Sequence, residues 1–237
     1  MSNAIYATLT RQNGLMQEMQ VVANNLANSS TTGYKADRAI FAEFLASTGP
    51  QSPSISMGSL AAHAFNFTEG GLKFTGGQFD MAIQGDGFFV IETAQGQRLT
   101  RAGHFQLSAE STLVDASGNS VLGSGGGVIT IPEAATNIQI SGDGTISANG
   151  ELIDRVSIVT ANGLLLRDSN TQFSAPDGFT ETQTATVMQG ALEQSNVSPV
   201  LEVARMIEVQ RAYEAGQALL EREDQRITQL ITALRER

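Results

Sequence analysis

The sequence predicts a mixed fold in which a long α-helix at each end of the chain flanks an all-β central domain of sandwich or barrel type. The two helices are expected to pair in a coiled-coil-like manner. Apolar residues recur every three or four positions at both ends, whereas short alternating runs separated by turn-forming pairs fill the middle. We therefore expect a discontinuous helical domain of residues 1–33 and 197–237, a connecting segment at 34–78 and an antiparallel β domain at 79–196.

The first helix is expected over about residues 4–30. Its apolar seam steps alternately by four and three residues and consists of Ile5, Leu9, Gln12, Met16, Met19, Ala23 and Leu26. Gln12 is the one clearly polar member of this seam. Ser and Thr residues at 29–32 compete for backbone hydrogen bonds, and Gly33 can adopt the left-handed conformation that ends a helix. The helix is thus predicted to stop within residues 29–33.

The last helix is expected to begin after Ser198 and Pro199, because serine caps helix N-termini and proline suits the first helical position. Its seam also steps by three and four and consists of Met206, Val209, Tyr213, Gly216, Leu220, Glu223, Ile227, Leu230 and Leu234. A helix of about 38 residues would be a rod of about 55 Å. Small residues around Gly216 would let another backbone approach closely, although helix propensity alone also explains its alanines.

Between the helices the pattern changes from helical to alternating. Residues 39–46 are expected to continue briefly as helix, and residues 47–53, punctuated by Gly and Pro, as a loop. Antiparallel strands are expected at 81–84, 87–93, 98–108, 138–141, 154–160 and 187–192. Two-residue hairpin turns are predicted at Asp143-Gly144, Asn149-Gly150 and Asn162-Gly163.

Composition excludes several classes of function. The net charge is −10, and residues 39–196 carry all of it, with 5 basic and 15 acidic side chains. Because no basic patch occurs, nucleic acid is a poor candidate partner. The chain has no cysteine, and no apolar run approaches the roughly 18–20 residues that cross a bilayer, so we expect no membrane insertion. The N-terminus does not resemble a secretory signal, so export would need another route.

Residues capable of chemistry occur without the spacing that chemistry needs. His63 and His104 share no metal-ligand pattern, and a strand follows Gly85-Asp86-Gly87 where a phosphate loop requires a helix. Residues 115–119 lack the glutamate of a calcium loop and are better explained as a hairpin turn. Asp80 and Asp86 could be paired carboxylates, but acidic residues are common in this segment. We expect no catalytic, cofactor or metal site.

Three asparagines near the end of the first helix are costly for helix propensity. Asn24 and Asn28 are four residues apart and face one way, and Asn25 faces a neighbouring strip. Such amides can fix the register between packed helices through hydrogen bonds. The alternative is that they face water where the helix frays.

Several motifs resemble those of the bacterial flagellar rod and hook proteins. At the N-terminal end these are residues 23–28 and 32–35, and at the C-terminal end residues 190–199 and 206–214. In the middle, residues 82–89, 99–105 and 143–146 also agree. The resemblance therefore covers nearly the whole chain, and it is strongest to the proximal-rod branch, with the distal-rod branch and the hook as alternatives.

The resemblance implies a structural subunit and not an enzyme. Family members leave the cell through the flagellar type III export channel without a cleaved signal and assemble in the basal body as a periplasm-spanning helical tube. Paired terminal helices form the inner layer, the β domain faces outward, and the tube transmits torque and encloses the export channel. The implied partners are other copies of this chain and other flagellar rod proteins, proximal and distal.

The assembly interface is expected to lie on the terminal segments, whose apolar seams neighbouring copies would cover. The expected residues are Ile5, Leu9, Met16, Met19, Asn24, Asn25, Leu26, Asn28, Gly33, Tyr34, Ser195, Asn196, Val197, Met206, Val209, Gln210, Tyr213, Leu220, Ile227, Leu230 and Leu234. Two other classes stay open from the residues alone. One is a carbohydrate-acting hydrolase that uses Asp80, Asp86 or Asp115, and the other is an adhesive module on a coiled-coil stalk.

Overall fold

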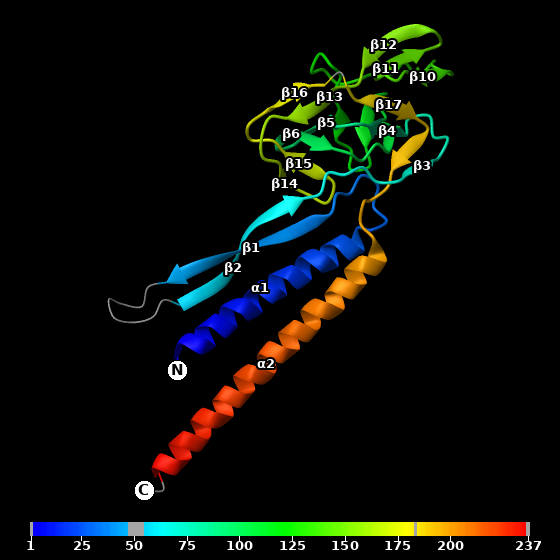
Figure 1. Cartoon of the computed structure of the whole chain (residues 1–237). Helices are drawn as coiled ribbons and strands as arrows, with labels where there is room; N and C mark the ends of the chain where they lie inside the picture. The colour runs from blue at the N-terminus through cyan, green and yellow to red at the C-terminus, as the bar shows by residue number, and fades with distance from the viewer. Residues whose placement is uncertain (1, 47–54, 183, 236–237) are drawn as a thin grey trace. The chain divides into compact units, whose positions relative to one another are not determined.

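The computed structural model describes residues 2–46, 55–182 and 184–235, which divide into two compact units (Figure 1). The helical unit contains Met1–Ala27, Ala36–Asn66 and Ser198–Arg237. The β unit contains Asn28–Lys35 and Phe67–Val197. This division assigns much of the expected connecting segment to the helical unit, and it assigns residues 28–35, which follow the first helix, to the β unit.

The helical unit contains both long helices. Helix α1 spans Ser2–Ala27 and helix α2 spans Pro199–Arg235. A helix at each end of a β-rich chain is therefore confirmed, and α2 begins at the predicted proline. Its 37 residues correspond to a rod of about 55 Å. Helix α1 ends at Ala27, earlier than predicted, while Gly33 does adopt the left-handed conformation with a φ of +69°.

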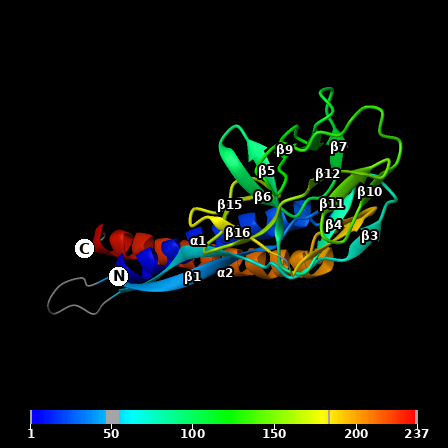
Figure 2. The ribbon, with the colours of Figure 1, turned by 90° about the horizontal axis from the view of Figure 1, so that it is seen from above.

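A long two-stranded hairpin completes the helical unit (Figure 2). Strand β1, Asp37–Ala46, pairs antiparallel with β2, Ile55–Phe65, and the register shifts between Ile40 and Phe41. The predicted helix at 39–46 is therefore wrong. Ala, Glu and Leu favour a helix locally, but pairing with β2 and packing against α1 outweigh propensity. The loop expected at 47–53 lies outside the described residues.

The β unit consists of short antiparallel strands in several sheets. The largest has the path β14-β15-β6-β5-β9-β8-β7, with β13 pairing β5 and β16, while β10-β11-β12, β17-β4 and β18-β3 form smaller sheets. The strands are β3 Leu72–Phe74, β4 Met81–Gln84, β5 Phe88–Thr93, β6 Gly96–Thr100, β7 Phe105–Leu107, β8 Leu113–Asp115, β9 Ser120–Val121, β10 Ile138–Ile140, β11 Thr145–Ala148, β12 Glu151–Arg155, β13 Ile158–Ala161, β14 Leu166–Arg167, β15 Gln172–Ser174, β16 Phe179–Glu181, β17 Thr186–Gln189 and β18 Ala191–Glu193. A β-rich middle is confirmed, whereas closure into a sandwich or barrel stays a prediction.

Two of the three hairpins that were predicted from turn-forming residue pairs are confirmed. Gly144, with a φ of +85°, lies in the β10–β11 connection, and Asn149-Gly150, both with positive φ, joins β11 to β12. Asn162-Gly163 does not join a hairpin, because β13 pairs with β5 and β16 and not with β14. The expected strands at 98–108, 154–160 and 187–192 are each interrupted into two.

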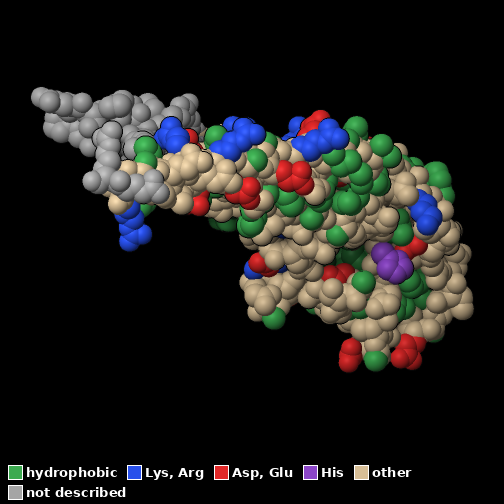
Figure 3. Space-filling view, turned by 90° about the horizontal axis from the view of Figure 1, so that it is seen from below, with side chains coloured by type: hydrophobic (Ala, Val, Ile, Leu, Met, Phe, Trp, Pro, Cys, Tyr) green, Lys and Arg blue, Asp and Glu red, His purple; other side chains and the backbone are tan. Residues whose placement is uncertain are grey.

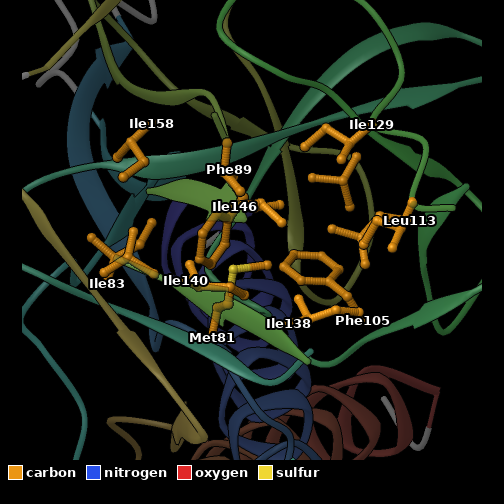
Figure 4. Close-up of a cluster of buried hydrophobic side chains, with 14 of the residues drawn as sticks. Met81, Ile83, Phe89, Phe105, Leu113, Ile129, Ile138, Ile140, Ile146 and Ile158 are labelled. Atoms are coloured by element: carbon orange, nitrogen blue, oxygen red, sulfur yellow. The ribbon is translucent and has the colours of Figure 1, made fainter. Parts of the chain in front are cut away.

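An apolar cluster of buried side chains lies inside the β unit (Figure 4). The cluster includes Met81, Phe89, Phe105 and Leu113, which lie on different strands and whose side chains point into a common interior. Ile129 and Ile131 join it from a segment outside the named strands. Burying each such side chain contributes about 1.5–3 kcal/mol. The β unit thus buries a core of its own.

Candidate assembly surface and buried junction

Residues predicted for an assembly interface on α1 lie in different environments. Leu9 and Met16 are about half exposed, with exposed fractions of 49 % and 48 %. Met19 and Leu26 are half-buried, and the side chain of Ile5 lies outside the described part of the structure. The seam is therefore divided, with one flank of α1 facing solvent.

Helix α2 shows a similar division. Of the predicted residues, Val209 is buried, and Met206, Tyr213, Leu220 and Ile227 are half-buried. Gln210, Leu230 and Leu234 are exposed. A second exposed apolar group, which the prediction missed, lies at the start of the helix and consists of Val200, Leu201, Val203 and Ile207.

Within the helical unit, polar contacts join α1 to α2 at several levels. Gln12 Nε2 donates to the Tyr213 carbonyl at 2.9 Å, and Arg205 forms an ion pair with Glu18 at 2.8 Å. This ion pair is partly exposed, so it contributes at most about 1 kcal/mol. These contacts hold the helices side by side over several turns.

Among the described residues of the helical unit, Asn25 has the most buried polar side chain, at 2 % exposure. Its amide binds both main-chain groups of Asp37, donating to the carbonyl at 2.8 Å and accepting from the N–H at 2.9 Å. Its Nδ2 also lies 3.4 Å from Glu202 Oε2 on α2. The register role expected for these amides is thus directed mainly at strand β1. Asn24 is exposed, and Asn28 is buried and accepts from the Thr31 hydroxyl in the following turn.

The remaining predicted interface residues lie in the β unit. Gly33, Tyr34 and Val197 are buried there. Asn196 donates from its side chain to the Thr68 carbonyl at 3.0 Å, and Ser195 Oγ accepts from the Val197 N–H. These residues therefore make contacts within their own chain.

A buried charge cluster, which we call the junction, joins the two ends of the β unit's chain and was not predicted from the sequence. Lys35 Nζ lies 2.5 Å from Glu193 Oε1, and Arg101 lies 3.3 Å from Glu193 Oε2. The three side chains are only 1–2 % exposed. The Gly33 N–H donates to the Glu193 carbonyl at 2.8 Å. Each of the three junction residues lies in one of the motifs noted above. Their place in those motifs was the feature of the sequence from which they could have been identified.

Surrounding groups satisfy most of the junction's hydrogen-bonding capacity. Lys35 also donates to the Thr68 carbonyl, Glu193 accepts the Gly70 N–H, and Arg101 donates to the Ile83 and Gly85 carbonyls. Burial lowers the pKa of Lys35, and the hydrogen bond and charge of Glu193 oppose that shift. Removing Glu193 would leave Lys35 and Arg101 as buried charges without their anion.

Glycine is required where residues 33 and 102 meet in the β unit. A Cβ at position 33 would lie 2.3 Å from the Ala102 amide nitrogen, and φ is already in the left-handed region. The guanidinium of Arg167 lies over the Tyr34 ring, 4.4 Å from its centroid. The segment before the hairpin is thus fixed on the β unit.

Two of the three carboxylates considered for catalysis accept structural hydrogen bonds. Asp80 is buried, binds His104 Nδ1 at 2.7 Å and accepts the Thr75 hydroxyl at 2.5 Å. Asp115 accepts the Ser117 and Asn119 N–H groups in the β8–β9 turn, as the hairpin interpretation predicted. His63 is exposed beside Asp37, and Asp86 is exposed.

Two kinds of feature do not occur in the described part of the chain. No group of three potential metal-binding residues is found in it. Neither of its helices combines the length and apolar character needed to cross a membrane.

Similarity to known protein families extends over both ends and the middle of the chain. Three family models match the chain: "Flagella basal body rod protein" at residues 5–35, "Flagellar hook protein FlgE/F/G D1 domain" at 82–148 and "Flagellar basal body rod FlgEFG protein C-terminal" at 188–233. The flagellar basal-body rod protein FlgF of Caulobacter vibrioides is 36 % identical over 230 residues, which cover 91 % of each chain. The chain belongs to the flagellar basal-body rod protein family.

Other relatives in the family agree. FlgF of Mesorhizobium japonicum is 32 % identical over 93 % of this chain and 92 % of its own. FlgG of Bacillus subtilis is 31 % identical over 99 % of this chain and all of its own. The recognised resemblance is confirmed, and the chain is most like FlgF. It is a structural rod subunit of the flagellum basal body and not an enzyme.

Proposed function

We propose that this rod subunit belongs to the proximal rod and assembles helically through the exposed faces of α1 and α2, which pair in coiled-coil fashion. In this proposal, other copies of the chain and other rod proteins, proximal and distal, cover those faces. The assembled rod crosses the periplasm, transmits torque and encloses the export channel. Its subunits arrive through the flagellar type III route, as the resemblance implies.

The exposed apolar side chains of the helical unit carry the proposal. Leu9 and Met16 lie seven residues apart on α1, and Val200, Val203 and Ile207 are exposed on α2. On the face drawn in Figure 3, hydrophobic side chains reach the surface between acidic and basic ones. Apolar groups repeated at helical spacing favour a helical partner. Contacts that do not close on themselves would produce a filament.

The test replaces part of this surface without touching the core. In the double variant Leu9→Gln/Met16→Gln, both side chains are already half exposed, so the subunit should fold normally. We expect the variant to be missing from isolated basal bodies and cells carrying it to lose motility. Leu152→Gln is the matched control, because Leu152 is 74 % exposed on β12 of the β unit.

Normal incorporation and motility of the double variant would overturn the proposed interface. Loss of motility in the Leu152 control as well would show that the effect is not confined to the terminal helices. The distal-rod and hook alternatives are tested by cross-linking the assembled subunit and identifying its neighbours. Adjacent FlgG alone on both sides would contradict a proximal position.

A further inference from the structure

A buried polar side chain interrupts the interface between α1 and α2. Gln12 is only 8 % exposed, and its Nε2 donates to the Tyr213 carbonyl at 2.9 Å. Within the described structure its Oε1 is buried and has no hydrogen-bond partner. A buried amide that is only half satisfied weakens a helix interface relative to an apolar residue. Its presence therefore calls for an explanation other than stability.

Position 216 on α2 is adapted to this amide. A Cβ at Gly216 would lie 2.2 Å from Gln12 Nε2, so any larger residue would displace the amide from the Tyr213 carbonyl. Glycine inside a helix is itself unfavourable compared with alanine. Gly216 and Ala212 also line a cavity of about 200 Å³ beside Gln12. The amide and the glycine thus fit each other, and each is costly alone.

The fit holds in one register only. The apolar seam of α2 repeats every three or four residues, so apolar contacts alone would permit α1 to shift along it by a heptad. Such a shift places Val209 or Glu223 opposite Gln12 in place of Gly216. Both residues carry a Cβ, which at position 216 would lie 2.2 Å from Gln12 Nε2, so the amide would have to move away from its hydrogen-bond partner.

We propose that Gln12 is a positioning residue that sets the register of α1 against α2, with Gly216 as its recognition site. The register fixes where the exposed Leu9 and Met16 lie relative to the exposed residues of α2. Gln12 thereby defines the composite surface that a neighbouring copy would meet. This last step depends on the proposed function, whereas the register itself does not.

The absence of cysteine from the chain makes the register directly measurable. Thr8 and Leu219 line the same cavity, so the full chain carrying Thr8→Cys/Leu219→Cys reports the observed register. Thr8→Cys/Arg226→Cys reports a register displaced by one heptad, because Arg226 lies seven residues beyond Leu219. Each purified, dilute protein is treated with a short bifunctional maleimide, and the intramolecular cross-link yield is measured.

With Gln12 present, we expect the observed-register pair to cross-link about tenfold more than the displaced pair, a ratio equivalent to roughly 1.4 kcal/mol. Gln12→Leu should lower this ratio severalfold, with the Arg205–Glu18 ion pair still favouring the observed register, while helix content stays unchanged or rises. Gln20→Leu is the matched control, since it makes the same substitution at an exposed position of α1, and it should leave the ratio unchanged. An unchanged ratio in Gln12→Leu would overturn the proposal.

Gly216→Ala provides a second variant in case Gln12→Leu disturbs folding. It should lower the observed-register yield in the chain with Gln12 and have no further effect in the Gln12→Leu background. Equal effects in both backgrounds would contradict recognition between the two residues. Because these measurements use a single unassembled chain, they remain valid even if the assembly test of Leu9 and Met16 fails.

Discussion

The two units differ in how far each buries its apolar side chains, although the β unit also exposes Phe74, Leu152 and Leu164. The β unit buries a continuous apolar cluster and encloses three charged side chains in its interior. The helical unit leaves Leu9, Met16, Leu230 and other large apolar residues exposed along its helices. The β unit therefore obtains its stability within one chain. The helical unit retains apolar surface, which suits a part that neighbouring subunits complete.

Each unit nevertheless contains a buried hydrogen bond at a glycine, where a side chain would collide with the neighbouring group. In the β unit, Gly33 makes a close approach to Ala102 and donates to Glu193. In the helical unit, Gly216 gives room to the Gln12 amide. The first contact belongs to a charged network and the second is one neutral hydrogen bond. Loss of the first should therefore cost much more.

The largest expected effect comes from neutralising the junction. Glu193→Gln leaves Lys35 and Arg101 buried without their anion, so the free energy of unfolding of the β unit should fall by about 3–5 kcal/mol. Urea unfolding followed by circular dichroism measures this. Glu133→Gln, at an exposed position, should change it by no more than about 0.5 kcal/mol.

A double-mutant cycle refines the same test. Adding Lys35→Met to Glu193→Gln removes one of the two unpaired cations, so part of the lost stability should return. If Glu193→Gln cost no more than the Glu133 control, the contrast between the interiors of the two units would not hold.

Backbone strain at Gly33 should have the next largest effect. Gly33→Ala combines an unfavourable φ with a Cβ 2.3 Å from a backbone nitrogen, and it should lower the free energy of unfolding by about 2–4 kcal/mol. Gly118→Ala has a similar φ of +84° but open space around it, so only about 1–2 kcal/mol is expected. Equal losses in the two thermal or urea unfolding curves would rule out the close approach as the cause.

The sequence predicted features that depend on local signals. The start of α2 follows from Pro199, and the two correct hairpins follow from residues that accept positive φ at 144 and 149–150. Helix periodicity identified both terminal helices, although it could not tell which flank of each would be exposed.

Features that depend on distant partners could not be predicted. Strand β1 has a helix-favouring composition, and its strand state depends on β2 and α1. The junction joins Lys35 to a glutamate 158 residues away, and charged residues are ordinarily expected on the surface. Sequence spacing also could not show that the Asn25 amide binds the main chain of a strand in addition to its contact with α2.

The smallest predicted effect concerns Asn25, and it tests whether the helical unit depends on any interior polar contact of its own. Asn25→Leu removes both hydrogen bonds to Asp37, so local opening of β1 should become easier by about 1–2 kcal/mol. Amide hydrogen exchange in a peptide covering residues 36–46 should then be about 5–30-fold faster. Gln20→Leu, at an exposed position of α1, should leave that exchange unchanged. If both variants exchange at the wild-type rate, Asn25 does not hold the hairpin, and pairing with β2 together with packing against α1 keeps β1 in place.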